Sequence, residues 1–335
     1  MKTLQRMNAT KPAAAHSSTH ALGVLAVLAL ALCLTMVTPV IASAADAPLQ
    51  VSVSIPPQKY FVERIGGDLV RTTVMVPPGA DPHTYEPKPS QLRGLSGSRI
   101  YFSIGAPFED AWLARIVAAA GPSLSVVPMH KGVTLLPAAA PLHSDEAEHA
   151  EGKEHHEDHH AHADGHGHDH GTTDPHVWLS PMLVRHMSLA IRDALAKADP
   201  AHAATYRANY DRFAADIDAM DKKFADLFAA LPQDRRRFLV FHPSWNYFAH
   251  NYGLTELSIE VEGREPSPRQ LRAIIDLARR ERITTIFVQP QFSRRAAQTI
   301  ATEIGARLVD ADPLAEDWAA NLERTAKALV QATGR

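Results

Sequence analysis

The sequence has one cysteine, Cys33, and this residue lies in the apolar stretch near the N-terminus. The rest of the chain has no thiol, so a disulfide-stapled fold is excluded there, and any metal site has to be built from imidazole and carboxylate groups. The chain also has no excess of basic residues, with 34 basic against 37 acidic side chains, and the basic residues form no stripe along the sequence. This charge balance argues against a nucleic-acid-binding protein.

Residues 1–45 carry only three charged side chains, and all three are basic. An apolar run from Ala21 to Val37 follows them and leads into a stretch of small residues that ends at Ala45. This order predicts a secretory signal peptide that is cleaved near Ala44 or Ala45, and therefore a periplasmic protein. An uncleaved anchor helix is the alternative, which the small residues at the exit and the missing stop-transfer pattern disfavour.

Short β-branched runs alternate with helical patterns in both halves of the remaining chain. In the first half the strand patterns lie at 51–55, 70–76, 99–104 and 124–129. In the second half they lie at 238–241, 255–261, 284–289 and 306–311. Such an alternation of strand and helix predicts a mainly parallel sheet with helices on both faces. We therefore predict an α/β fold with two lobes, each containing one such sheet.

A helical segment at 181–234 separates the two halves. Asp199 and Pro200 form a typical N-cap and first-turn pair, which predicts a second helix from there to about Ala230. Such a helix is about 45 Å long at 1.5 Å per residue, so we expect a rigid backbone helix that joins the lobes. A helical hairpin packed on one lobe is the alternative. The predicted domains are an N-terminal lobe at 46–180, the linking helices at 181–234 and a C-terminal lobe at 235–335.

Several potential metal ligands follow strand patterns. His83 lies in a loop rich in proline and glycine, His176 at the end of a histidine-rich stretch, and His242 directly after a strand pattern. Asp310 and Asp312 follow the last strand pattern. Ligands of open α/β sheets bind beyond the carboxyl ends of the strands, and three imidazoles with one carboxylate suit zinc. Each residue alone is weak evidence, because a histidine after a strand is more often a surface residue and an aspartate before proline is also a good helix N-cap.

Six segments together carry a family resemblance: PGADPHTYEPKPSQL, DPHVWLSP, FHPSWNYFA, IEVEGREPSP, IFVQPQFS and DADPLAEDW. With these segments in this order, the chain after residue 45 resembles the periplasmic solute-binding proteins of zinc and manganese ABC importers, the cluster A-I family. The resemblance implies two lobes joined by one long helix, a single metal ion held between them, and a permease in the inner membrane as partner. It also implies a monomeric binding protein and not an enzyme. The metal ligands that it implies are His83, His176, His242 and Asp312.

The third implied ligand bears on the choice of metal. Members that bind manganese tend to carry a carboxylate where this chain has His242, so the resemblance implies zinc, since harder oxygen ligands suit manganese. Manganese stays as the alternative, because some relatives with three histidines and one aspartate have ambiguous selectivity. A zinc hydrolase is a further alternative, but outside the histidine-rich run the chain has no helical HExxH pair with a general base, and a carboxylate would close the fourth position.

Residues 143–170 are crowded with histidine and acidic side chains and have no core-forming apolar pattern. This composition predicts a disordered loop, because such a segment cannot bury enough apolar surface to offset the entropy of ordering. We expect the loop to bind additional zinc ions weakly and to raise the metal supply beside the main site, without supplying ligands to that site. A solvated insertion that is indifferent to metal is the alternative.

Other side chains near these motifs have two interpretations each. Glu260, Glu262 and Glu265 are candidates for orienting a histidine through its second ring nitrogen, or they are turn and helix-entry residues. Ser267 before Pro268 is expected to cap a helix. Three aromatic residues are candidates for shielding the metal from water, or they pack beside strand ends; these are Trp178, Trp245 and Tyr247.

Overall fold

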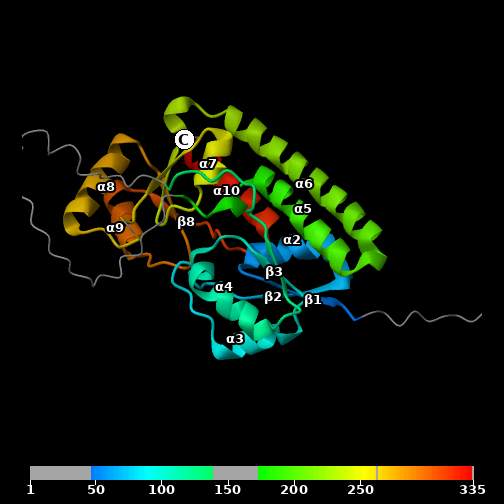
Figure 1. Cartoon of the computed structure of the whole chain (residues 1–335). Coiled ribbons are helices and arrows are strands. Elements are labelled where there is room, and N and C mark those ends of the chain that lie inside the picture. The colour runs from blue at the N-terminus through cyan, green and yellow to red at the C-terminus, as the bar shows by residue number, and fades with distance from the viewer. Residues whose placement is uncertain (1–46, 139–172, 262, 334–335) are drawn as a thin grey trace, which may run out of the picture. The chain divides into compact units, whose positions relative to one another are not determined.

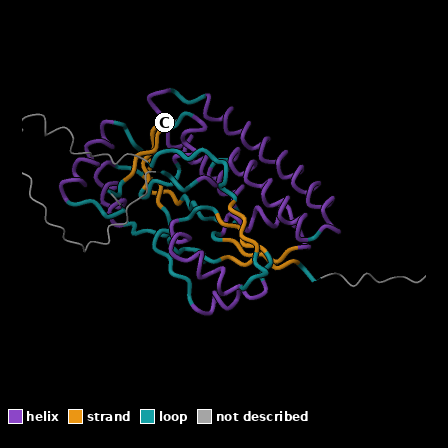
Figure 2. The backbone as a smooth tube through the Cα atoms, in the orientation of Figure 1, coloured by secondary structure: helices purple, strands orange, loops and turns teal. Residues whose placement is uncertain are grey.

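The computed structural model describes residues 47–138, 173–261 and 263–333 (Figure 1). The predicted signal peptide and the predicted loop at 143–170 lie outside the described residues. None of the described helices combines the length and the apolar character that crossing a membrane requires. Two four-stranded parallel sheets form the framework, and Figure 2 shows their strands as two separate groups. The predicted α/β fold with two parallel sheets is therefore confirmed.

The first lobe contains β1 (Leu49–Val53), α2 (Pro56–Gly66), β2 (Val70–Val74), α3 (Pro89–Gly94), β3 (Ile100–Ser103), α4 (Pro107–Ala120) and β4 (Ser125–Pro128). Its strands follow the order β2-β1-β3-β4, and all neighbours run parallel. Val51 in β1 pairs with Thr72 on one side and with Ile100 on the other. Strand β3 is buried at every position, as helices on both faces of a parallel sheet require. The carboxyl ends of all four strands therefore meet at one edge.

The second lobe contains β5 (Arg237–Val240), α7 (Asn246–Tyr252), β6 (Thr255–Ser258), α8 (Pro268–Arg280), β7 (Thr285–Val288), α9 (Arg295–Ile304) and β8 (Arg307–Asp310). Its order β6-β5-β7-β8 repeats the topology of the first sheet, again with parallel neighbours only. The predicted helix cap is confirmed, because the Ser267 hydroxyl accepts the backbone N–H of Gln270 at the start of α8. The Gln270 side chain in turn accepts the N–H of Ser267, which completes a capping box.

Two long helices connect the lobes: α5 (Pro181–Ala198) and α6 (Ala203–Ala229). They pack along each other (Figure 1), and α6, with 27 residues, is about 40 Å long. The regular part of α6 begins at Ala203 and not at Pro200 as predicted, because a short 3-10 turn occupies Pro200–His202. The Asp199 carboxylate accepts hydrogen bonds from the His202 ring and the Tyr206 hydroxyl, and these contacts accompany the short turn before the regular helix.

The hydrophobic core has two parts. The larger part joins the first lobe to the connecting helices, to α7 and to the last helix, α10 (Trp318–Thr333). Trp318 at the start of α10 packs edge-on against Phe61 of α2, with ring centroids 5.1 Å apart. The smaller part lies between the second sheet and helices α8 and α9. The chain therefore returns from the second sheet to pack its last helix against elements of the first lobe.

Candidate metal site

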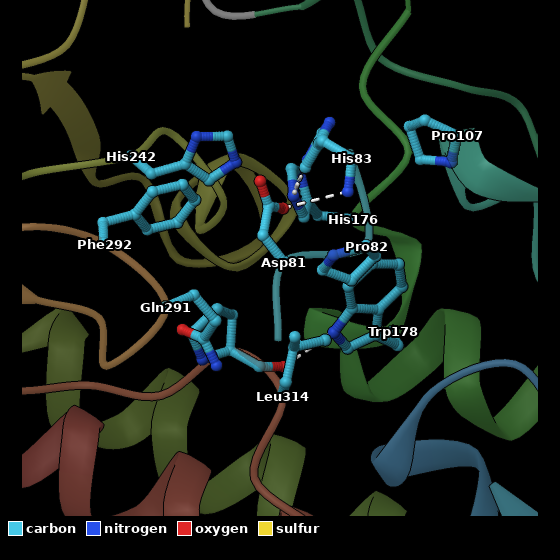
Figure 3. Close-up of a pocket in the computed structure, with 11 residues that line it drawn as sticks. Asp81, Pro82, His83, Pro107, His176, Trp178, His242, Gln291, Phe292 and Leu314 are labelled. Atoms are coloured by element: carbon cyan, nitrogen blue, oxygen red, sulfur yellow. Dashed lines mark hydrogen bonds between the residues drawn. The ribbon is translucent and has the colours of Figure 1, made fainter. Parts of the chain in front are cut away.

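Three histidine side chains from both lobes converge at the carboxyl edges of the two sheets. The potential ligand atoms of His83, His176 and His242 all lie within 4.8 Å of one another. The Nε2 atoms of His83 and His176 are 3.5 Å apart (Figure 3). Two nitrogens that bind one tetrahedral zinc ion at 2.0–2.1 Å lie about 3.3–3.4 Å apart. This pair of imidazoles therefore already has the spacing that a shared zinc ion requires.

Local backbone contacts hold each histidine in place. His83 lies between β2 and α3, and the Oδ1 atom of Asp81 accepts its backbone N–H at 2.9 Å. His176 lies before α5 and is held in the same way by Asp174, at 2.8 Å. His242 lies two residues after the end of β5, and the Gln289 side-chain amide accepts its N–H and donates to its carbonyl. An aspartate two residues earlier thus fixes the backbone of His83 and of His176, and Gln289 fixes the backbone of His242.

Buried carboxylates orient two of the imidazole rings. Asp174 Oδ1 lies 2.7 Å from Nδ1 of His176, and Glu260 Oε1 lies 2.9 Å from Nδ1 of His242. Both carboxylates are at most 5% exposed. A ring that donates its Nδ1–H carries its lone pair on Nε2, and the carboxylate behind it increases the basicity of that nitrogen. A carboxylate behind the imidazole is a common arrangement for histidines that could hold a metal ion.

The structure distinguishes among the acidic residues considered from sequence. Glu260 has the predicted orienting position, Glu265 is exposed, and Glu262 lies outside the described residues. Sequence reasoning missed Asp174, although the tripeptide Asp-Pro-His occurs at both 81–83 and 174–176. This repeated spacing is a signal that could have pointed to the aspartate as well as to the histidine.

A third buried carboxyl group, Glu256 on β6, lies behind the site and was also missed. Its Oε1 atom accepts the backbone N–H groups of Ser244 and Trp245, at 3.1 and 2.9 Å. Burial raises the pKa of Glu256 to about 8, and the charges of Asp174 and Glu260 act in the same direction. Glu256 therefore keeps its proton through most of the neutral range and adds little negative charge next to the two orienting carboxylates.

Apolar groups surround the three histidines in a pocket (Figure 3). Phe292 stacks on His242 with ring centroids 4.6 Å apart, and Trp178 meets His176 edge-on at 5.3 Å. Pro313 and Leu314 add further apolar surface to the wall. Such a lining excludes water from the donors and strengthens their interaction with a bound cation.

The three aromatic residues considered from sequence have different positions. Trp178 lines the pocket, and its Nε1–H donates to the carbonyl of Pro313 at 2.8 Å, which links the two walls. Tyr247 lies behind the wall, where its hydroxyl donates to the carbonyl of Asp174 at 2.8 Å. Burial raises the pKa of Tyr247 to about 12, so the hydroxyl keeps its proton for this bond. Trp245 packs edge-on against Phe248, which is the packing alternative.

The two aspartates after β8 have different surroundings. Asp310 is exposed and pairs with Arg294 at 2.5 Å. Asp312 is half-buried, and its Oδ1 atom accepts Nε2–H of the pocket residue Gln291 at 2.7 Å and the N–H of Leu314 at 2.9 Å. Among the described residues, its carboxylate is not part of the group of ligand atoms that the three histidines form. Asp312 thus lies directly behind the pocket wall, while Asp310 is held at the surface.

A known protein family accounts for this arrangement. The family described as zinc-uptake complex component A, periplasmic (ZnuA), matches residues 51–332. The chain belongs to this family. It is therefore a periplasmic-type solute-binding protein of the zinc and manganese group, as the sequence motifs predicted. Members of the ZnuA family are transport proteins and not enzymes, so the hydrolase alternative is wrong.

Individual relatives support the assignment to the ZnuA family. The high-affinity zinc uptake system protein ZnuA of Paracoccus denitrificans is 38% identical over 253 residues, which are 71% of this chain and 75% of the relative. The manganese-binding lipoprotein MntA of Halalkalibacterium halodurans is 25% identical over 246 residues, 73% of this chain and 72% of the relative. A crystal structure of a ZnuA deletion mutant with zinc bound is 39% identical. It superimposes with a TM-score of 0.72, covering 85% of this chain and 98% of the other.

Proposed function

We propose that this chain captures one zinc ion in the periplasm, through His83, His176, His242 and Asp312, and delivers it to the permease of an ABC importer. The observation that carries this proposal is the convergence of three imidazoles from two lobes, with ligand atoms within 4.8 Å of one another. A site that closes between two lobes can take up its cargo from solution and release it when the lobes separate. We propose a monomer as the working form.

The donor set supports zinc as the cargo. Three imidazole nitrogens and one carboxylate oxygen make a four-coordinate site of the kind that zinc prefers, and no thiolate is needed. The carboxylates behind His176 and His242 make these nitrogens better donors to a divalent cation. Manganese remains a second candidate, because one relative of this chain is named as a manganese-binding lipoprotein. Manganese, however, favours oxygen-rich sites, and three of the four proposed donors here are nitrogens.

The histidine-rich run at 143–170 has a separate proposed role. It lies outside the described residues, and none of the four proposed ligands belongs to it. A ZnuA protein that carries a deletion was solved with zinc bound, which is consistent with a main site that tolerates loss of a segment. We propose that this run binds further zinc ions weakly and supplies them to the main site. We also propose that the leader is removed near Ala44 or Ala45.

Competitive zinc titration of single-alanine variants tests the proposal. Each of His83→Ala, His176→Ala and His242→Ala removes one of four bonds, so we expect zinc affinity to fall by more than roughly 100-fold, the upper range for residues that only orient ligands. Asp312→Ala should cost less, because water can replace the carboxylate. His250→Ala is the matched control, since this histidine is exposed on α7. A histidine variant that keeps the wild-type affinity would exclude that residue as a ligand.

A further inference from the structure

Gln291 connects the pocket wall to Asp312. It lies in the loop after β7, and Asp312 lies in the loop after β8, the neighbouring strand in the sheet. Its Nε2 atom donates to Asp312 Oδ1 at 2.7 Å. Figure 3 shows Gln291 among the pocket residues, close to Phe292. The side chain therefore bridges the space that a cation enters and the carboxylate proposed to bind it.

Charge fixes the orientation of the Gln291 amide. The reverse orientation would place its carbonyl oxygen against a carboxylate oxygen, which is unfavourable. With Nε2 directed at Asp312, the Gln291 Oε1 atom is buried without a hydrogen-bond partner among the described residues. A buried acceptor without a partner costs free energy that an apolar side chain would avoid. Stability alone therefore does not explain an amide at this position, whereas its contact with Asp312 does.

Asp312 is held at three points. The N–H of Leu314 donates to the same Oδ1 atom at 2.9 Å, and Asn321 on α10 donates to the backbone carbonyl at 2.7 Å. Among the described residues, both hydrogen bonds to the carboxylate therefore fall on one oxygen. That oxygen is occupied by two N–H donors, which leaves Oδ2 as the oxygen available to a cation. A carboxylate fixed in this way is suited to bind through one oxygen and not through two.

We propose that Gln291 is a positioning residue that restricts Asp312 to one-oxygen binding and thereby favours zinc over manganese. This inference rests on the proposed function, in which Asp312 completes the site. Three nitrogens and one oxygen give the four-coordinate geometry that zinc prefers. A second oxygen from Asp312 would raise the coordination number toward the oxygen-rich, higher-coordinate environment that suits manganese. The Gln291 amide keeps the second oxygen, Oδ1, in a hydrogen bond and thus away from the ion.

The test compares Gln291→Met, which keeps the length of the side chain but removes its donor, with the matched control Gln298→Met on the exposed face of α9. Gln291→Leu serves as a second variant. Zinc and manganese affinities are measured by competition, and the cobalt(II)-substituted protein is examined by visible absorption. We expect the ratio of zinc to manganese affinity to fall by about tenfold in both Gln291 variants, in the range typical of residues that orient ligands. The strong four-coordinate cobalt bands should weaken, and the control should match the wild type.

A residue that only ties two loops together would lower the unfolding midpoint without changing the affinity ratio or the cobalt spectrum. Wild-type values of both in the Gln291 variants would therefore overturn the inference. Asp312→Ala separates this failure from failure of the proposed function. If that variant keeps the zinc affinity and cobalt spectrum of the wild type, Asp312 is not a ligand and the underlying assignment is wrong. If it changes both while the Gln291 variants do not, only the role of Gln291 is wrong.

Discussion

Two turns with the same tripeptide, Asp-Pro-His at 81–83 and at 174–176, place two of the three site histidines. In both turns the aspartate accepts the backbone N–H of the histidine, at 2.9 and 2.8 Å. The second aspartate also contacts the ring of its histidine, through Nδ1 at 2.7 Å, and the first accepts the Thr84 hydroxyl with its other oxygen, at 3.3 Å. The tripeptide thus fixes the backbone turn, and the surroundings decide what orients the ring.

The surroundings of the two turns differ in burial and in support. Asp81 lines the pocket and is partly exposed, whereas Asp174 is 3% exposed. Tyr247 bridges the second turn to the preceding chain, because its hydroxyl donates to the Asp174 carbonyl and accepts the N–H of Leu136. A buried carboxylate interacts more strongly with its partner than an exposed one does. The second turn should therefore contribute more to metal affinity, although both turns contain the same tripeptide.

Within the comparison of the two turns, the largest expected effect is a difference between Asp174→Ala and Asp81→Ala. Removing Asp174 takes away the ring contact of His176, so we expect zinc affinity to fall roughly 10- to 100-fold. Removing Asp81 costs mainly one backbone hydrogen bond, worth about 1 kcal/mol of stability, and should change affinity much less. Competitive zinc titration and urea unfolding of both variants measure the two effects. Equal losses of affinity would show that the shared turn, and not the ring contact, is what matters.

An intermediate effect is expected from Glu256, whose pKa the charge of Asp174 helps to raise. The folded-state pKa, about 8, lies above the ordinary carboxyl value of 4.5, so the folded chain binds this proton more tightly than the unfolded chain does. The contribution of this group to stability is therefore fully present below pH of about 4.5 and is lost as the pH rises toward about 8. Glu256→Gln cannot ionise. Its stability relative to the wild type should rise steadily across that range.

Urea unfolding of wild type and Glu256→Gln at several pH values, without zinc, measures this difference directly. Groups that titrate in both proteins contribute equally to both free energies of unfolding, so their contribution disappears from the difference. When Asp174→Ala is added to both proteins, their difference in stability should change less with pH, because one of the charges that raise the pKa of Glu256 is then absent. A stability difference that stays constant between pH 5 and 8 would contradict the assignment of a protonated Glu256.

Several elements of the fold and site follow from sequence for clear physical reasons. Strands β3 and β7 are buried at every position, as covered parallel sheets require, and the regular alternation of strand and helix patterns made both strand successions recognisable. The three histidines could be selected because each follows a strand or a Pro-rich turn in a segment of the ZnuA family. Only the family resemblance favoured Asp312 over Asp310, and this choice stays a prediction, while Asp310 pairs with Arg294 at the surface.

Other features depend on contacts that no local pattern contains. Asp174 and Asp81 are both followed by Pro-His, so only tertiary packing reveals that Asp174 holds an imidazole ring. Glu256 lies in a short strand pattern, and its raised pKa arises mainly from burial, to which the charges of Asp174 and Glu260 add. The later start of α6 is accompanied by contacts of His202 and Tyr206 with the carboxylate of Asp199, which was expected to cap the helix. In each case packing or a side-chain contact, and not the local pattern, carries the difference.

The smallest expected effect on the tight site comes from the segment that separates the two Asp-Pro-His turns in sequence. Deleting residues 143–170 leaves both turns, His242 and Asp312 in the chain, so we expect one zinc ion per chain to bind with nearly unchanged affinity. Further, weaker ions should be lost with the segment. These ions need neutral imidazole, whose unperturbed pKa is about 6.5, so lowering the pH from about 7.5 to about 5.5 should remove them from the full-length chain before the main site empties. Elemental analysis and competitive titration of both chains measure the two classes of site. Loss of the tightest site upon deletion would mean that the histidine-rich run, and not the pair of turns, is the principal receptor.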